Sequence, residues 1–144
     1  MKRQLLIKTA LIALALGISG CGTIAQRTAA TKTRVVFQVS DNDAGKWNLA
    51  LNNAKNVQQE LGADKVEIEI VAYGPGIGML KADAVTNSRV MEATKSGIKV
   101  VVCENTMTVQ KLTKADMNPV ISYVPAGVVE LMRLHSEGWA YIRP

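Results

Sequence analysis

The sequence has little of the chemistry from which metal sites and disulfide frameworks are built. Its 144 residues include one histidine, His135, and two cysteines, Cys21 and Cys103, with no C-x-x-C pair. These three residues cannot complete a zinc site without added carboxylates. No G-x-S-x-G motif and no pair of catalytic acids is visible either. We therefore expect neither a bound metal nor an organic cofactor.

Aromatic residues and excess charge are also scarce. Aromatics make up 4% of the chain, which leaves no platform for stacking bases. The formal net charge is +5, but three of the 17 basic residues (Lys2, Arg3 and Lys8) lie in a segment that we expect to be removed, which leaves about +2. Nucleic acid is therefore not an expected partner. The hydrophobic share of 48% is enough for one domain with a core.

Residues 1–20 have the pattern of a secretory signal peptide. Met1–Gln4 is basic, and the apolar run Thr9–Ile18 is about half as long as a bilayer span. Ile18-Ser19-Gly20-Cys21 resembles a bacterial lipobox, which implies that Cys21 is lipidated and becomes the first residue of the mature protein. An ordinary cleaved signal with an incidental cysteine is the alternative.

Residues 21–33 then join the membrane to the domain. They lack apolar periodicity and are rich in small or polar side chains, which is typical of a flexible tether. The expected location is the cell envelope, as a lipoprotein that faces the periplasm. In a host with two membranes, Gly22 rather than Asp after Cys21 implies the outer membrane.

Residues 34–144 alternate short apolar runs with helical patterns. Strands are predicted at 34–40, 65–73, 98–103, 120–124 and 139–142, and helices at 44–61, from about 79 to 96, at 106–114 and from 127 to about 137. This alternation predicts a three-layer α/β/α domain with a five-stranded, mainly parallel sheet. Sites in such sheets form at the carboxyl ends of the strands.

The second predicted strand differs from the others in its pattern. Val66, Ile68 and Ile70 alternate with Glu67 and Glu69, which predicts one wet face or a position at the edge of the sheet. The central strand at 98–103 is instead a nearly continuous apolar run, which predicts burial on both faces.

The central strand ends at Cys103 and runs directly into a predicted helix, for which Asn105 is the expected N-cap. Backbone N–H groups and the positive end of the helix dipole stabilise a thiolate at such a junction. The alternative is that Cys103 is a small apolar residue at the end of a buried strand, because cysteine is among the most buried residue types.

Other polar or glycine-rich stretches carry weaker signals. The run from Gly74 through Gly76 to Gly78 does not match G-x-G-x-x-G, so a plain turn is favoured, although a backbone lining for the Cys103 site is possible. Asp41 and Asp43 are expected to cap the helix at 44–61 rather than to form a carboxylate pair.

His135, near the end of the last helix, suits the dipole there better than it suits the role of a base for Cys103.

Four stretches carry a resemblance to the DsrE/DsrF-like family of small sulfur-relay proteins. They are Val100-Val101-Val102-Cys103-Glu104-Asn105-Thr106-Met107, Val71-Ala72-Tyr73-Gly74-Pro75-Gly76-Ile77, Val124-Pro125-Ala126-Gly127-Val128 and Glu137-Gly138-Trp139-Ala140-Tyr141-Ile142-Arg143-Pro144. The resemblance covers residues 34–144. It implies a homo- or hetero-oligomer, often a trimer or hexamer, and a persulfide carried on Cys103 between a sulfur donor protein and an acceptor protein.

On this interpretation Asn105 and Thr106 stabilise the sulfur anion, and Gly74, Gly76 and Gly78 line the approach to it. Two other functions stay open. The domain could be a non-catalytic oligomeric binding or assembly module at the membrane, with Cys103 as a core residue. It could also be a redox sensor that forms an intermolecular disulfide, for which the mature chain has no second free cysteine of its own.

Overall fold

The computed structural model describes residues 31–144, so the predicted signal peptide, Cys21 and most of the tether lie outside the described residues. Five strands form one sheet: β1 (Thr33–Val39), β2 (Val66–Ala72), β3 (Lys99–Cys103), β4 (Ser122–Val124) and β5 (Ala140–Ile142). Their order is β4-β3-β2-β1-β5, and every pair is parallel. The predicted five-stranded parallel sheet is confirmed.

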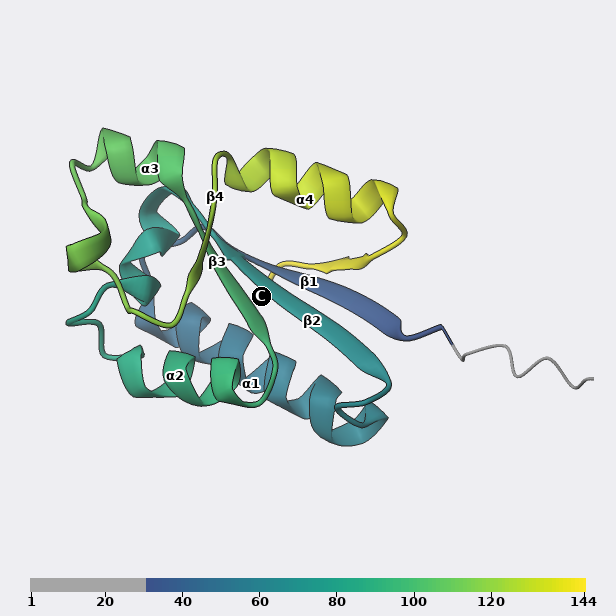
Figure 1. Cartoon of the computed structure of the whole chain (residues 1–144). Helices are drawn as coiled ribbons and strands as arrows, with labels where there is room; N and C mark the ends of the chain where they lie inside the picture. Colours follow the sequence, from purple (N-terminus) through teal and green to yellow (C-terminus); the bar gives the residue numbers. More distant parts are fainter. Residues whose placement is uncertain (1–30) are drawn as a thin grey trace, which may run out of the picture.

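The helices cover both faces of this sheet (Figure 1). The helices α1 (Ala44–Leu61) and α2 (Asn87–Lys95) pack on one face and α4 (Gly127–Ser136) on the other, whereas α3 (Glu104–Val109) lies beyond the carboxyl end of β3 and buries Met107 in the same cluster as α1 and α2. Two short 3₁₀ helices, η1 (Gly74–Leu80) and η2 (Lys114–Asp116), complete the fold. The three-layer α/β/α architecture follows from parallel strands whose crossover helices must return over the sheet.

The α1 helix has the bounds that its sequence predicts. Its apolar stripe, which includes Trp47, Ala50, Leu51 and Ala54, is buried against the sheet. Asp43 is its N-cap and accepts a hydrogen bond from the backbone N–H of Lys46 at 3.1 Å. Asp41 has a different role from the expected cap, since it pairs with Lys46 at 3.2 Å and with Arg143 at 3.4 Å.

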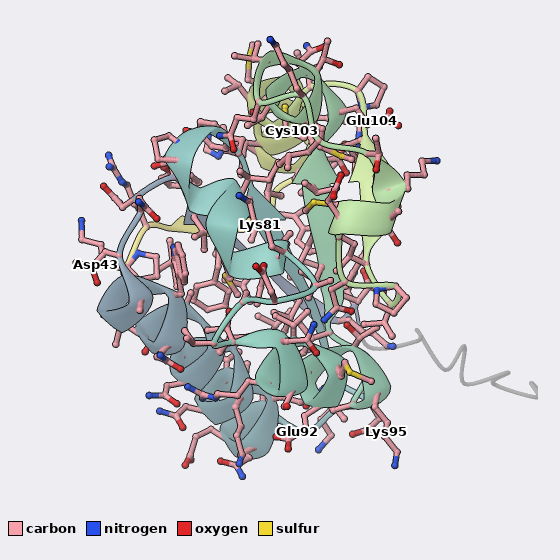
Figure 2. All side chains as sticks on the ribbon, turned by 90° about the vertical axis from the view of Figure 1, so that its left-hand side faces the viewer. Asp43, Lys81, Glu92, Lys95, Cys103 and Glu104 are labelled. Carbon is pink, nitrogen blue, oxygen red and sulfur yellow. The ribbon has the colours of Figure 1, made fainter. Side chains whose placement is uncertain are left out.

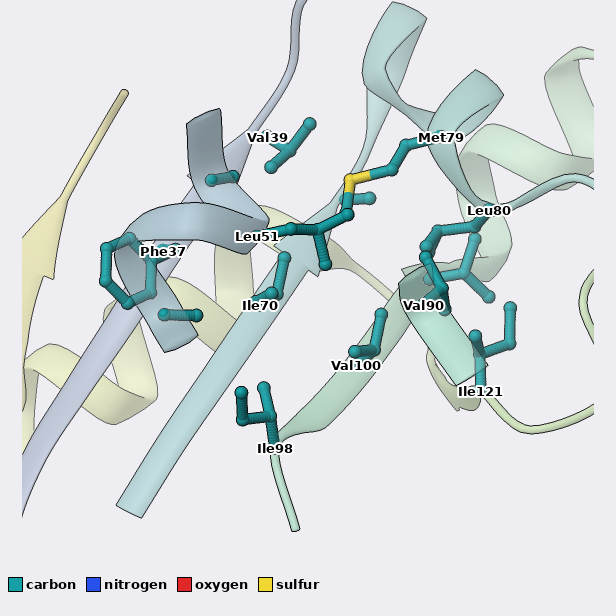
Figure 3. Close-up of a cluster of buried hydrophobic side chains, with 14 of the residues drawn as sticks. Phe37, Val39, Leu51, Ile70, Met79, Leu80, Val90, Ile98, Val100 and Ile121 are labelled. Atoms are coloured by element: carbon teal, nitrogen blue, oxygen red, sulfur yellow. The ribbon is translucent and has the colours of Figure 1, made fainter. Parts of the chain in front are cut away.

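The main core lies between the sheet and the layer of α1, α2 and η1 (Figure 3). The fully buried side chains in it include Phe37, Ile70, Met79, Leu80 and Val90. A smaller cluster on the other face joins Val36, Val71 and Val101 to Leu131 and Leu134 of α4. Burial of this apolar area contributes about 25 cal/mol per Å² and is the main force that holds α4 on the sheet.

Three predictions about the elements are corrected by the structure. The helix expected from about 79 to 96 is divided into η1 and α2, because Lys81 bridges to Met117 and the Thr86 hydroxyl donates to the Met79 carbonyl at 2.7 Å. The N-cap of α3 is Cys103 rather than Asn105, since β3 passes into the helix with no residue between them. The β2 strand is the central strand of the sheet and not an edge, and of its two glutamates Glu67 is exposed whereas Glu69 is buried.

Candidate functional site

Cys103 lies at the carboxyl edge of the sheet, at the end of β3 (Figure 2). It is opposite Val124 of β4, and its neighbour Val102 is opposite Ala72 of β2. The last residues of three strands therefore meet around this cysteine. Glu104 begins α3 immediately after it, at the end of the molecule remote from Lys95 (Figure 2). The expected position at a strand end is where the structure places Cys103.

Polar groups from two helices lie around the Cys103 sulfur. They are the hydroxyl and the backbone N–H of Thr106, the backbone N–H of Asn105 and the backbone N–H of Gly127. The Cys103 side chain makes no N-cap hydrogen bond, and the Asn105 N–H donates to the Pro125 carbonyl, so these groups act on the sulfur by their proximity. Burial raises the pKa of the Cys103 thiol, but these N–H and O–H groups together outweigh it, so that the pKa lies below its ordinary value. The arrangement favours a thiolate.

Thr106 is oriented by a contact from η1. Its Oγ1 accepts a hydrogen bond from the backbone N–H of Gly74 at 3.0 Å. With that lone pair occupied, the hydroxyl hydrogen is free to be donated to the Cys103 sulfur. Gly74 therefore belongs to the surroundings of the site, where it acts through Thr106.

Gly127 brings the first turn of α4 against Cys103. A Cβ atom at Gly127 would lie 3.0 Å from the Tyr73 Cβ and 3.3 Å from the Cys103 Cβ. A larger residue would therefore push the helix, and with it the Gly127 N–H, away from the sulfur. The Pro125 carbonyl oxygen contacts two groups of the site. It accepts a hydrogen bond from the Asn105 N–H at 3.1 Å and lies 4.0 Å from the Cys103 sulfur.

The cysteine is almost enclosed in the single chain. It is 5% exposed, and an open hollow of about 350 Å³ lies beside it. The hollow is lined by Gly74, Pro75, Asn105, Thr106, Val109 and Gln110. Asn105 and Thr106, which both lower the pKa of the Cys103 thiol, thus also line the hollow.

The structure gives the other predicted glycines packing roles. A Cβ at Gly76 would lie 2.4 Å from the Val39 carbonyl oxygen, and one at Gly78 would lie 2.9 Å from the Trp47 ring. Both therefore face β1 and α1 and let η1 approach them closely. The segment from Gly74 to Gly78 is a 3₁₀ helix rather than the plain turn expected.

His135 lies in the last turn of α4, at the end of that helix opposite to Gly127, and it is exposed. Within residues 31–144, no three His, Cys, Asp or Glu side chains are placed to hold a metal ion. No helix in this described part is both long and apolar enough to cross a membrane.

Sequence reasoning missed Gly127 and the role of Gly74. Their sequence neighbours do not reveal that Gly127 meets Cys103 or that Gly74 meets Thr106, since these contacts join residues that lie 24 and 32 positions apart. The only signal available was that both glycines lie at predicted strand ends, where sites form in parallel sheets.

Several proteins of known structure are similar to this chain. A protein of unknown function from Methanobacterium thermoautotrophicum, MTH1491, has a similar structure with 34% sequence identity and a TM-score of 0.75, over 78% of this chain and 100% of that one. BT1422 from Bacteroides thetaiotaomicron, also of unknown function, shares 16% identity with a TM-score of 0.65, over 77% and 94% of the two chains.

The ychN protein of E. coli shares 9% identity with a TM-score of 0.63, over 79% of this chain and 99% of that one. At these identities BT1422 and ychN show the fold alone. None of the curated proteins matches the chain. Residues 33–144 match the DsrE/DsrF-like family, and together with the likeness to MTH1491 this match shows that the chain belongs to the DsrE/DsrF-like family.

Proposed function

We propose that the protein carries sulfane sulfur as a persulfide on Cys103. The observation that supports this most directly is the position of Cys103 at the junction of β3 and α3, where N–H and O–H groups of Asn105, Thr106 and Gly127 lower the pKa of its thiol. Such donors stabilise a thiolate, which is the nucleophilic form of cysteine. Membership of a sulfur-relay-related family supports the same conclusion.

The transfer consists of two thiol-exchange steps. In the first, the Cys103 thiolate attacks the outer sulfur of a donor persulfide, the sulfur–sulfur bond of the donor breaks, and the donor leaves as a thiolate. In the second, an acceptor thiolate attacks the outer sulfur on Cys103, and Cys103 leaves as a thiolate. No net oxidation or reduction occurs. The same donors favour Cys103 as nucleophile in the first step and as leaving group in the second.

Exposure of the purified protein to inorganic polysulfide tests this proposal. We expect peptide mass spectrometry to find a mass gain of one sulfur on Cys103, which dithiothreitol removes. Cys103→Ser should show no gain at this peptide and should not pass sulfur to an acceptor thiol. A Cys103→Ser protein that still transfers sulfur would contradict the proposal.

A second candidate function has observations of its own. Cys103 is only 5% exposed, as a core residue would be. Large apolar side chains also lie exposed together on α4 and β5, where a second copy of the chain could pack; they are Val128, Val129, Met132, Tyr141 and Ile142. The domain would then be an oligomeric binding or assembly module. Failure of iodoacetamide to modify Cys103 in the native protein, with rapid modification after unfolding, would favour this function, and light scattering gives the oligomer size.

We also propose that the protein is anchored to the cell envelope through a lipid on Cys21, which lies outside the described residues. The support is the lipobox-like Ile18-Ser19-Gly20-Cys21 after a basic and apolar leader. Cells fed a labelled fatty acid should incorporate the label into the wild-type protein and not into Cys21→Ala. Equal labelling of both would overturn the assignment.

A further inference from the structure

Glu69 is a buried acid in the middle of the sheet that the proposed sulfur chemistry does not use. It lies on β2, the central strand, and is 2% exposed. Its Oε2 accepts from the Lys99 ammonium at 3.0 Å, while its Oε1 is buried without a hydrogen-bond partner among the described residues. A buried carboxylate oxygen with no donor is costly, which favours the protonated form of Glu69.

A second carboxyl group lies beside it on α4. The Glu130 Oε1 is 3.7 Å from the same Lys99 ammonium, so the two carboxyl groups meet at one cation, and each affects the pKa of the other. Two ionised carboxylates repel each other and have no hydrogen to donate, whereas a proton on one of them allows a hydrogen bond between them. We propose that Glu69 and Glu130 share one proton, and that this proton fastens α4 to the sheet.

The surrounding charges assign the proton mainly to Glu69. Arg133 holds both oxygens of Glu130, at 2.9 and 2.7 Å, and reaches Glu137 at 2.5 Å. Burial raises the pKa of Glu69 against the opposing effect of Lys99, and the hydrogen bond from Arg133 lowers the pKa of Glu130. Environments that separate two pKa values in this way are typical of a pair that holds one proton.

Three more charged residues lie near the pair. Lys32 and Glu67 line a second hollow, distinct from the one beside Cys103, together with Glu69 and Lys99. Arg34 of β1 donates to the Glu137 carbonyl oxygen at 2.6 Å. If Glu69 and Glu130 both ionise, they carry two negative charges beside Lys99 and Arg133, and Arg133 is already shared with Glu137. One proton on the pair therefore balances the cluster.

The sign of the pH dependence follows from these directions. The raised pKa of Glu69 means that its protonated form contributes stability at low pH, which is lost as the pH rises through that pKa. The pKa of Glu130 is lowered, so its ionised form contributes stability, which is lost as the pH falls through that pKa. The packing of α4 on the sheet should therefore be most stable at pH values between the pKa of Glu130 and the pKa of Glu69.

Glu69→Gln is the sharpest test, because a glutamine amide N–H can replace the shared proton without a change of shape. We expect its urea unfolding midpoint to equal that of the wild type at mildly acidic pH and to exceed it at alkaline pH, where the wild-type pair loses the proton. A Glu69→Gln protein that is less stable than wild type at every pH would show that Glu69 is an ordinary ion-pair partner of Lys99, and would overturn the proposal.

Carbon-13 NMR of labelled glutamate carboxyl groups gives an independent measurement. One glutamate should titrate above all others in the wild type, and its signal should be absent in Glu69→Gln. In Glu130→Gln it should titrate lower, because the negative neighbour is gone. Glu92→Gln, an exposed change on α2, is the matched control and should alter neither result. If Glu69 titrates with the exposed glutamates, the shared proton does not exist.

Discussion

Thr106→Val should slow the alkylation of Cys103 by iodoacetamide about threefold, at a pH where the wild-type thiol is mainly protonated. Valine has nearly the shape of threonine but lacks the hydroxyl that lowers the pKa of the Cys103 thiol. A hydrogen bond to a charged group contributes about 1.5 kcal/mol or more, and 1.4 kcal/mol is a factor of ten in an equilibrium. The thiolate fraction falls by that factor, but the more basic thiolate is about threefold more nucleophilic, so the rate falls by only about threefold.

Thr106→Ser is the control for this experiment, because serine keeps the hydroxyl that accepts from the Gly74 N–H and lowers the pKa of the Cys103 thiol. We expect it to alkylate at close to the wild-type rate. Thr106→Val also leaves the Gly74 N–H without an acceptor, which costs about 1–3 kcal/mol of stability if water does not replace it. Ultraviolet absorbance of the thiolate against pH separates the two effects, since a purely structural loss would leave the thiol titration where it was.

The same substitution bears on the choice between the two candidate functions. If Cys103 is a core residue, its alkylation depends on rare opening of the fold, and a destabilised Thr106→Val protein should then react faster. If Cys103 is a sulfur carrier, it should react more slowly and should accept sulfur from polysulfide more slowly by a similar factor. The sign of the change in rate therefore distinguishes a buried thiol from an activated one.

The fold could be predicted from the sequence because its elements are locally specified. Asp43 caps α1 and Gly62 ends it, while the apolar stripe of that helix sets which face is buried. The continuous apolar run of β3 predicts an inner strand that ends at Cys103. These features depend on residues close together in the chain, and a single sequence contains them all.

The details of the site could not be predicted because they depend on contacts between distant segments. The Gly127 N–H lies near the Cys103 sulfur because α4 begins against Tyr73 and Cys103, and Thr106 is oriented by η1. The burial of Glu69 could not be predicted for a related reason. Alternation with Val66, Ile68 and Ile70 predicts a wet face, but Lys99 and Glu130 from other elements make burial of this acid possible.

Gly76→Ala should destabilise the domain by about 3 kcal/mol or more, the largest effect on stability that we expect from a single methyl group. The added Cβ would lie 2.4 Å from the carbonyl oxygen, 2.6 Å from the carbonyl carbon of Val39 and 2.8 Å from the Ser40 nitrogen. These are backbone atoms at the end of β1, which cannot turn aside as the end of a side chain can. Overpacking of this kind typically costs 1–3 kcal/mol and sometimes more.

Gly97→Ala is the control that isolates this steric effect. Gly97 has a φ of +93°, and a Cβ there would meet no atom within 4 Å, so its cost is the backbone strain alone, about 1–2 kcal/mol. Urea unfolding of the two variants should therefore give a clearly larger loss for Gly76→Ala. Because Val39 also accepts from the Tyr73 N–H at 3.1 Å, displacement of η1 should reach Gly74 and Thr106 and slow the alkylation of Cys103. Equal losses in the two variants would mean that η1 moves away from β1 at little cost, and that its close packing does not hold the site in place.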